Sequence, residues 1–352
     1  MRNLYLSIVK KERKGPLSFT VFLALLPFSS LYYLVLRIRE LLYRWGLLRS
    51  TSLPLPVISV GNITTGGTGK TPLVEFLTRF LLDKGKKVAI LSRGYNGIKR
   101  PLGEVNDEYL EFRENLPNVP ILLGKNRLSS ARTAMEEYHP NCIILDDGFQ
   151  HWRLQRVLDV VVIDSLEPFG NGGLIPSGTL REPLRNLRRA GLFILSHTDQ
   201  CDPKALEDLK RNLGEIDSNI PIVESIHYPL HLEDPGGQRL DTSWLRGKRL
   251  YAFCGLGNPL SFQKTLQLLG GEIVGFRAFP DHHHYSNKDI DFVAREALQL
   301  EAEALITTQK DMVKLREYSL WPIPILSLKI EIRITKGLEF LSDKLEKVVQ
   351  WG

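Results

Sequence analysis

A chain of 352 residues is long for a single compact core, and its composition, 43% hydrophobic and 24% charged, excludes a disordered or fibrous protein, so we expect two domains. Its three cysteines, Cys142, Cys201 and Cys254, lie far apart without CxxC spacing, which argues against a disulfide framework or a zinc site and indicates a reducing, cytosolic compartment. The formal net charge of +6 suits an anionic partner but does not separate nucleic acid, acidic lipid and phosphorylated substrate.

The first predicted element is an apolar helix near the N-terminus. No charged residue occurs from Gly15 to Leu36, a length of about 20 residues that would just span a bilayer, but Pro27 interrupts it. A spanning helix normally has one basic side, whereas this segment has basic residues on both: Lys10, Lys11, Arg13 and Lys14 before it, and Arg37, Arg39 and Arg44 after it. We therefore expect residues 1–50 to form a helix or broken helix that lies in the cytoplasmic membrane interface. The alternative is a buried core helix; a signal peptide is disfavoured, because no cleavage site follows.

The next strand and helix enclose a glycine-rich loop. Leu55–Val60 is a short β-branched run that ends at Gly61, and apolar residues at helical spacing begin at Leu73. The sequence between them, GNITTGGTGKTP, is typical of a phosphate-binding loop, although Thr64 stands where the usual pattern has glycine. A chance glycine-rich turn before a helix is the alternative.

Each residue of such a loop has a definite task. The backbone amides surround phosphate oxygens, a lysine reaches the β- and γ-phosphates, and a hydroxyl ligates Mg²⁺. These tasks fall here to the amides of Gly66, Gly67, Thr68 and Gly69, to Lys70 and to Thr71. The sequence therefore predicts ATP and Mg²⁺ as cofactors.

A second acidic position follows where a P-loop fold needs one. Cys142–Leu145 is predicted as a buried parallel strand, and Asp146 and Asp147 stand at its carboxyl end, where such sheets bind ligands. Two adjacent carboxylates can hold the Mg²⁺ shell between them; a surface Asp-Asp turn is the alternative. After a further strand, Ser196–Asp199 lacks the Asn and Lys of a guanine-binding element, so we expect ATP rather than GTP.

The remaining pattern predicts an α/β fold with a P-loop NTPase-like parallel sheet, helices on both of its faces, and a smaller second α/β domain. We expect a P-loop domain over residues 51–221, a second domain over residues 222–333, and a C-terminal helix within residues 334–352 that packs on the first domain. The runs 222–228 and 325–333 could pair as a two-stranded hinge between the domains.

Several unlinked strings resemble one family in its own order. They are SVGNITTGGTGKTP at 59–72, LSRGY at 91–95, NDE at 106–108, LDDGFQH at 145–151, LREP at 180–183, FPDHHHY at 279–285 and TTQKD at 307–311. Together they look like tetraacyldisaccharide 4'-kinase, the lipid A pathway kinase, whose phosphate loop also starts without glycine. The resemblance implies that ATP phosphorylates a tetraacylated glucosamine disaccharide 1-phosphate at the inner membrane of a Gram-negative bacterium.

The resemblance also assigns roles to residues. Lys70 and Thr71 match the family's phosphate-loop pair, and Arg127 sits where the family has a basic residue near a phosphate. The acidic Mg²⁺-site residues correspond to Asp146, Asp147 and Glu182. The proposed general base corresponds to Asp107, with His282 as its partner, although the family's Gly-Asp-Glu-Pro around the base is Asn106–Tyr109 here.

Two other classes of protein share part of this pattern. A membrane-tethered P-loop ATPase that acts as a regulatory switch would need the loop but not Asp107 or His282. A nucleic-acid-binding ATPase would use the positive charge, yet the basic residues gather around the N-terminal segment and form no binding module, so we expect no nucleic-acid partner. We expect a monomer, and no zinc at His282–His284, because adjacent side chains in an extended loop point in alternating directions.

Overall fold

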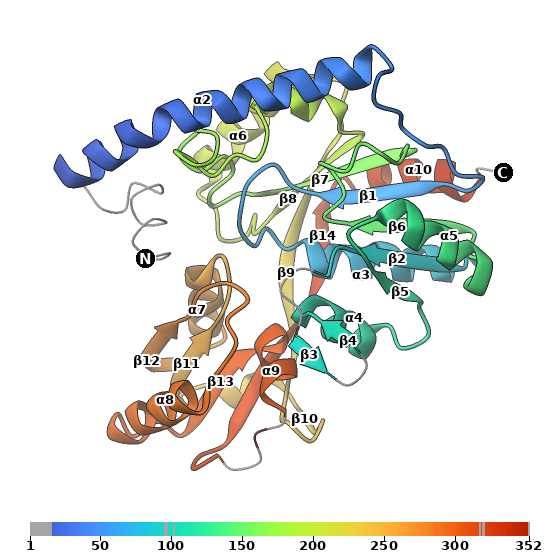
Figure 1. Cartoon of the computed structure of the whole chain (residues 1–352). Helices are drawn as coiled ribbons and strands as arrows, with labels where there is room; N and C mark the ends of the chain where they lie inside the picture. The colour runs from blue at the N-terminus through green and yellow to red at the C-terminus, as the bar shows by residue number, and fades with distance from the viewer. Residues whose placement is uncertain (1–15, 95–97, 101–102, 317, 319–320, 351–352) are drawn as a thin grey trace. The chain divides into compact units, whose positions relative to one another are not determined.

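The structure is a computed structural model, and it describes residues 16–94, 98–100, 103–316, 318 and 321–350. These residues form two compact units. The first comprises the described residues up to Arg93, Gly124–Ile226 and those from Ile334 onward; the second comprises Gly94–Leu123 and His227–Arg333. Each unit is an α/β assembly (Figure 1).

The first unit is built on a parallel sheet whose central strand leads into the glycine loop. Its strands run in the order β9-β8-β7-β1-β6-β2, and all the pairs from β2 to β8 and the start of β9 are parallel. Their bounds are β1 Val57–Gly61, β2 Val88–Ser92, β6 Cys142–Asp146, β7 Leu158–Asp164, β8 Leu192–Ser196 and β9 Ile222–Glu233. Every residue of β1, β2, β6 and β8 is buried, as expected for strands covered on both faces.

Helices cover this sheet. α3 (Lys70–Asp83) packs against β1, β2 and β6, and α5 (Arg127–Tyr138) against β2. The leucines of α6 (Pro203–Ile216) join the inward residues of β7 and β8 in one core cluster. The η1 turn is Leu184–Arg189, and α10 (Leu338–Val349) buries Leu341, Leu345 and Val348. α10 belongs to this unit, on which the sequence predicts the C-terminal helix to pack.

The N-terminal segment forms one continuous helix, α2 (Pro16–Arg44), and Pro27 lies inside it without breaking it. Of the described helices, it alone is long and apolar enough to cross a membrane, and only 6% of its most apolar window is buried. This exposure contradicts the alternative of a buried core helix.

The second unit contains the parallel strands β12-β11-β13-β14 of the same 12-stranded sheet, with helices on both faces. Alternate residues of β11 and β13 enter two different clusters: one packs on α7 and the other on α8 and α9. The bounds are β10 Arg239–Leu240, η2 Thr242–Leu245, β11 Arg249–Cys254, α7 Pro259–Leu268, β12 Glu272–Ala278, α8 Asn287–Gln299, β13 Ala304–Thr308, α9 Gln309–Leu315 and β14 Ile325–Lys336.

One boundary differs from the expected domains. Residues 94–123, which carry β3 (Ile98–Arg100), β4 (Gly103–Val105), α4 (Asp107–Asn115) and β5 (Ile121–Leu123), belong to the second unit and not to the P-loop domain. The reason is that α4 packs on α9: Phe112 is fully buried, and Gln309 donates from Nε2 to Asn115 Oδ1 at 2.8 Å. The segment leaves the first unit and returns to it at neighbouring positions. Gly124, directly after the segment, donates its N–H to the carbonyl of Ser92, just before it, at 3.0 Å.

Two strands belong to both units. β9 and β14 are hydrogen-bonded neighbours, and each runs from residues of one unit into residues of the other. Both are longer than the runs 222–228 and 325–333 that suggested a hinge.

Candidate active site

The glycine loop lies between the end of β1 and the start of α3, as the sequence predicts. Gly66 (φ 128°) and Gly69 (φ 82°) adopt backbone conformations that side-chain-bearing residues rarely adopt. No neighbouring atom lies within 4 Å of where a Cβ of Gly66 would stand, so the loop is open at this point.

The Thr68 hydroxyl is buried without a hydrogen-bond partner in the described part of the chain, while Ser196 Oγ donates to the Thr68 carbonyl at 3.0 Å. Gly67 and Thr71 complete the stretch, with Thr71 in the first turn of α3. A loop that is open at Gly66 and has an unpartnered hydroxyl at Thr68 fits a nucleoside triphosphate.

The two carboxylates after β6 have different environments. Because Val60 pairs with Asp146 in the parallel register, Asp146 lies beside the entrance to the loop, and its Oδ2 accepts from Ser92 Oγ at 2.9 Å. Asp147 accepts two hydrogen bonds from the Arg181 guanidinium, at 2.7 and 2.8 Å, and lies 3.6 Å from Lys70 Nζ. Burial acts to raise the pKa of Asp147, but the charges of Lys70 and Arg181 outweigh it and hold that pKa well below its usual range.

The other residues that the resemblance selected are also near the end of β6, but each already has partners. Glu182 is 1% exposed, and its Oε2 accepts from Asn186 at 2.7 Å and from Arg189 at 2.8 Å. Arg127 donates to the backbone carbonyls of Gly124 and Asp146, the latter at 3.3 Å. In this geometry Arg127 ties the end of β6 to the start of α5.

Carboxylate and hydroxyl oxygens are the donors that Mg²⁺ prefers, and Asp146 and Thr71 supply them beside the loop. Among the described residues no cluster of three or more His, Cys, Asp or Glu side chains could hold a metal by itself. The residues therefore fit a magnesium ion that shares the oxygens of a bound nucleotide.

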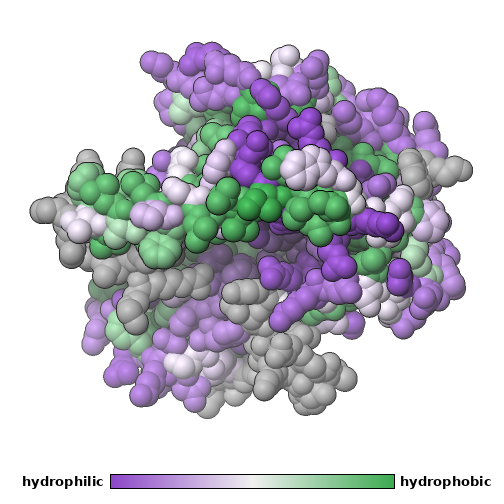
Figure 2. Space-filling view, turned by 45° about the horizontal axis from the view of Figure 1, so that its top comes forward, coloured by the Kyte–Doolittle hydropathy of each residue, from purple (hydrophilic) through white to green (hydrophobic). Residues whose placement is uncertain are grey.

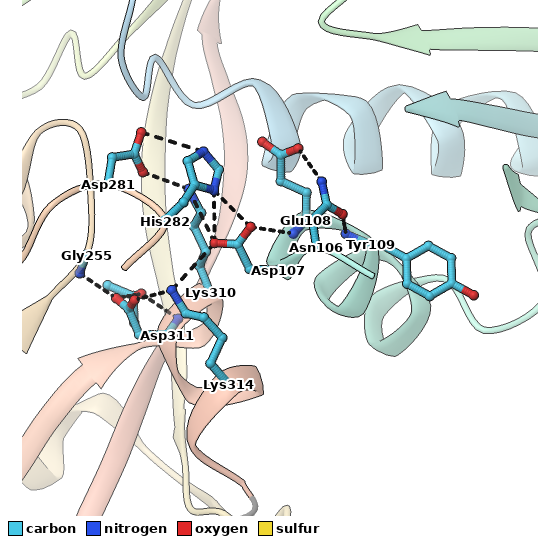
Figure 3. A network of polar contacts seen from close by, with 11 residues as sticks. Asn106, Asp107, Glu108, Tyr109, Gly255, Asp281, His282, Lys310, Asp311 and Lys314 are labelled. Atoms are coloured by element: carbon cyan, nitrogen blue, oxygen red, sulfur yellow. Dashed lines mark hydrogen bonds and ion pairs between the residues drawn. The ribbon is translucent and has the colours of Figure 1, made fainter. Parts of the chain in front are cut away.

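The second group of predicted residues meets in the second unit, around the start of α4 (Figure 3). Asn106 caps α4 by accepting from the Tyr109 N–H, which places Asp107 in the first helical turn. His282, with φ 60°, projects from the loop after β12, and its Nδ1 lies 2.9 and 3.0 Å from the two oxygens of Asp107. Asp107 and His282 are 175 positions apart in sequence, so the fold alone brings them together.

Two lysines of α9 stand behind this pair. Lys314 Nζ lies 3.5 Å from Asp107 Oδ2 and 2.9 Å from Asp311 Oδ1, and Lys310 Nζ lies 3.0 Å from Asp281 Oδ1 (Figure 3). Asp311 is fully buried, and it accepts from the Gly255 N–H at 2.9 Å and from the Thr308 hydroxyl at 2.7 Å.

These charges set the protonation of the pair. Burial acts to raise the pKa of Asp107, but the hydrogen bond from His282 and the charges of Lys310 and Lys314 outweigh it and hold that pKa well below the usual range. Burial acts to lower the pKa of His282, and its hydrogen bond to Asp107 reverses this, so the pKa of His282 is raised. The carboxylate is therefore ionised, and the imidazole binds a proton more readily than a free histidine.

The neighbouring histidine does not share this site. His283 Nε2 lies 3.2 Å from Asp289 Oδ2, and its ring stacks on Phe279 at 4.7 Å between centroids. His282 and His283 thus contact different carboxylates, although the backbone here is a turn and not the expected extended loop, since the His283 N–H donates to the Pro280 carbonyl at 3.0 Å.

Sequence reasoning missed five charged residues of these two groups: Arg181, Asp281, Lys310, Asp311 and Lys314. Arg181 stands in the LREP string beside Glu182, and Lys310 and Asp311 stand in TTQKD, so the strings contained them. The spacing of Lys310 and Lys314, four residues apart in a helix, places both on one face and was the available signal.

Comparison with known proteins points to one family. A family model described as LpxK, tetraacyldisaccharide-1-P 4'-kinase, matches residues 21–350. A tetraacyldisaccharide 4'-kinase of Syntrophus aciditrophicus (strain SB) is 41% identical over 341 residues, covering 91% of each chain, and one of Halothermothrix orenii is 36% identical over 349 residues, covering 91% of this chain and 90% of the relative. The crystal structure of LpxK from Aquifex aeolicus in complex with ATP has a TM-score of 0.72 at 31% identity, and the match covers 93% of this chain and 99% of that one. The chain therefore belongs to the tetraacyldisaccharide-1-P 4'-kinase family.

Proposed function

We propose that this chain transfers the γ-phosphate of ATP to the 4'-hydroxyl of a tetraacyldisaccharide 1-phosphate, giving lipid IVA in lipid A biosynthesis. The observation that carries the proposal is the pairing of the buried carboxylate of Asp107 with the half-buried His282, in a chain of this family that also has an open phosphate loop. A regulatory P-loop switch needs the loop but has no use for the pair.

The nucleotide is held by the first unit. The amides of Gly66–Gly69 and the ammonium of Lys70 bind its β- and γ-phosphates, with the dipole of α3 directed at the same oxygens. Thr71 and Asp146 would hold Mg²⁺, and Asp147 and Glu182 would add negative charge nearby. When bound, Mg²⁺ neutralises charge on the phosphate oxygens. Lys70 and Arg181 supply positive charge from the protein, and Arg127 fixes the end of β6.

The acceptor hydroxyl gives up its proton to the pair in the second unit. We assign Asp107 as the general base because its carboxylate is ionised and lies against His282, which orients it through the Nδ1 hydrogen bond. The two groups titrate as a pair, since they share that bond. Phosphoryl transfer asks little more of the protein than alignment and charge neutralisation.

The acceptor is a lipid, and α2 provides a surface that suits its membrane. Large apolar side chains of α2 are exposed, among them Phe19 (63%), Phe28 (62%) and Leu31 (60%). Figure 2, in which the top of Figure 1 comes forward, shows a hydrophobic band on this face of the molecule. Basic residues follow at Arg37 and Arg44. We infer that α2 lies in the cytoplasmic interface of the inner membrane, where the acceptor is embedded.

The phosphate loop and the carboxylate–histidine pair belong to different units, so the reaction requires both. We propose that β9 and β14, which run through both units, form a two-stranded hinge.

The test is to incubate the full chain with γ-labelled ATP and the tetraacyldisaccharide 1-phosphate in detergent micelles, and to extract with organic solvent. We expect label in the organic phase, and its absence with Asp107→Ala. Label found only as inorganic phosphate would refute the kinase and favour the switch.

A further inference from the structure

Helix α2 directs three polar side chains to the protein, while many of its large apolar side chains are exposed. Ser29 is 7% exposed, whereas its neighbour Phe28 is 62% exposed. Ser29, Tyr32 and Arg39 recur at intervals of three and seven residues, which places them on one face of the helix. All three make hydrogen bonds to residues of the first unit outside α2.

The main contact of this polar face is the segment 174–182. Ser29 Oγ lies 2.8 Å from Ser177 Oγ and accepts from the Ser177 N–H at 2.9 Å. One helical turn later, the Tyr32 hydroxyl donates to the carbonyl of Arg181 at 2.8 Å. These bonds join residues almost 150 positions apart, and two of the groups, Ser29 and Ser177, are buried.

The same segment lies along the phosphate loop. The Thr65 N–H donates to the Thr179 carbonyl, and the Arg181 N–H donates to the Ile63 carbonyl, both at 2.7 Å. The Arg181 side chain donates to Asn62 Oδ1 at 3.1 Å and to both oxygens of Asp147. Arg181 is thus fixed through its backbone N–H by the loop, through its carbonyl by α2, and through its side chain by Asp147.

A second route runs from α2 to the same loop. Arg39 donates to the carbonyl of Gln150 at 2.6 Å, and the Gln150 side chain donates to the carbonyl of Asn62 at 2.9 Å. Both routes therefore end on Asn62–Thr65, the residues that lead from β1 into the glycines.

We propose that Tyr32 and Ser29 are positioning residues through which α2 holds the segment 174–182, and with it the phosphate loop, in the geometry that binds the nucleotide. The helix that faces lipid is then part of the nucleotide site and more than a tether. This inference rests on the proposed nucleotide site, and it does not depend on which acceptor receives the phosphate.

The experiment compares two tyrosines that are adjacent in α2. Tyr32→Phe removes only the hydroxyl that holds Arg181, and Tyr33→Phe removes a hydroxyl whose partner is the exposed side chain of Arg185. The dissociation constant of ATP with Mg²⁺ is measured by calorimetry on the full chain in neutral detergent, without acceptor lipid. We expect Tyr32→Phe to raise it about 2- to 10-fold, the usual consequence of losing one hydrogen bond, and Tyr33→Phe to leave it unchanged.

Steady-state kinetics separates positioning from a general structural role. Tyr32→Phe should raise the KM for ATP and leave the KM for the lipid acceptor unchanged, and Ser29→Ala should act in the same direction if Tyr32→Phe does not fold. Unchanged ATP affinity in a folded Tyr32→Phe or Ser29→Ala variant would overturn the proposal, as would an equal loss in Tyr33→Phe. A wild-type chain that binds ATP but labels no lipid would refute the proposed function and leave this comparison intact.

Discussion

The charge around Asp107 is arranged to accept one proton. Three carboxylates, Asp107, Asp281 and Asp311, are matched by two ammonium groups, Lys310 and Lys314, within 3.9 Å. With neutral His282 this cluster is one positive charge short, and a proton on His282 completes it. The raised pKa of His282 and the lowered pKa of Asp107 are consistent with this balance.

Lys310→Met should move the acidic limb of the pH profile of kcat/KM to higher pH. The charge of Lys310 lowers the pKa of both Asp107 and His282. Its removal therefore raises both pKa values, and the acidic limb moves in the same direction whether it reflects the titration of Asp107 or of His282. A single charge at this distance shifts a carboxyl pKa by about 1 unit or more, so we expect a shift of about 1 pH unit.

A matched control for Lys310→Met is Lys248→Met. Lys248 belongs to the same unit and also pairs with a carboxylate, that of Glu303, but both side chains are largely exposed, at 38% and 43%. We expect no change in its pH profile, because exposed pairs are screened by water. A limb that stays in place in Lys310→Met, or moves to lower pH, contradicts the account of the cluster.

Removing the base itself should have a larger effect. Asp107→Ala should lower kcat at least about 10²-fold, because a positioned general base contributes 10²- to 10⁴-fold. The measurement is label transfer to lipid under saturating ATP, with circular dichroism to verify the fold. Near wild-type turnover in Asp107→Ala would eliminate the base assignment.

At the scale of elements, local patterns were predictable from sequence and distant pairings were not. The strand, loop and helix around Lys70 follow from one contiguous stretch, and buried runs such as Cys142–Leu145 show the strands directly. Asp107 and His282 are 175 positions apart, and no local pattern connects them, so only the family resemblance predicted their pairing. The transfer of residues 94–123 to the second unit was not predictable either, because their strand and helix pattern continues the rhythm of the first.

The same distinction explains what was missed in α2. Its apolar composition predicted an exposed membrane-facing helix, but Ser29 and Tyr32 look like minor interruptions in an apolar run. Their importance comes from Ser177 and Arg181, which no periodicity connects to them. The sequence also did not decide whether Pro27 breaks this helix, and in the structure α2 continues through it.

The exposed face of α2 gives a prediction about membrane binding. Leu31→Glu should lower the partition of the chain into vesicles of zwitterionic and anionic lipid at least about tenfold, since burying a leucine is worth 1.5–3 kcal/mol and a buried carboxylate costs more. The control is Leu268→Glu in α7, since Leu268 is exposed to 68% against 60% for Leu31. Co-sedimentation with vesicles measures both; equal losses in the two variants would mean that α2 is not the membrane-binding element.

At the scale of the whole molecule, the residues proposed to bind the nucleotide and those proposed to activate the acceptor belong to different units. The phosphate loop, Asp147 and Arg181 belong to the first, and Asp107, His282 and the two lysines of α9 belong to the second. The chain passes between them at 93–94, 123–124, 226–227 and 333–334, and the last two crossings lie inside the continuous strands β9 and β14.

This division predicts that nucleotide binding and turnover respond separately to substitution. His282→Ala should lower kcat at least about 10²-fold while the dissociation constant of ATP stays within about 2-fold of wild type, because the residues that hold the phosphates are in the other unit. Lys70→Ala should weaken ATP binding and turnover together, since it removes the charge that reaches the terminal phosphates. Calorimetry with ATP and label transfer to lipid measure the two quantities on the same preparations. If His282→Ala weakens ATP binding as much as Lys70→Ala does, the second unit takes part in holding the nucleotide and the proposed division of labour is wrong.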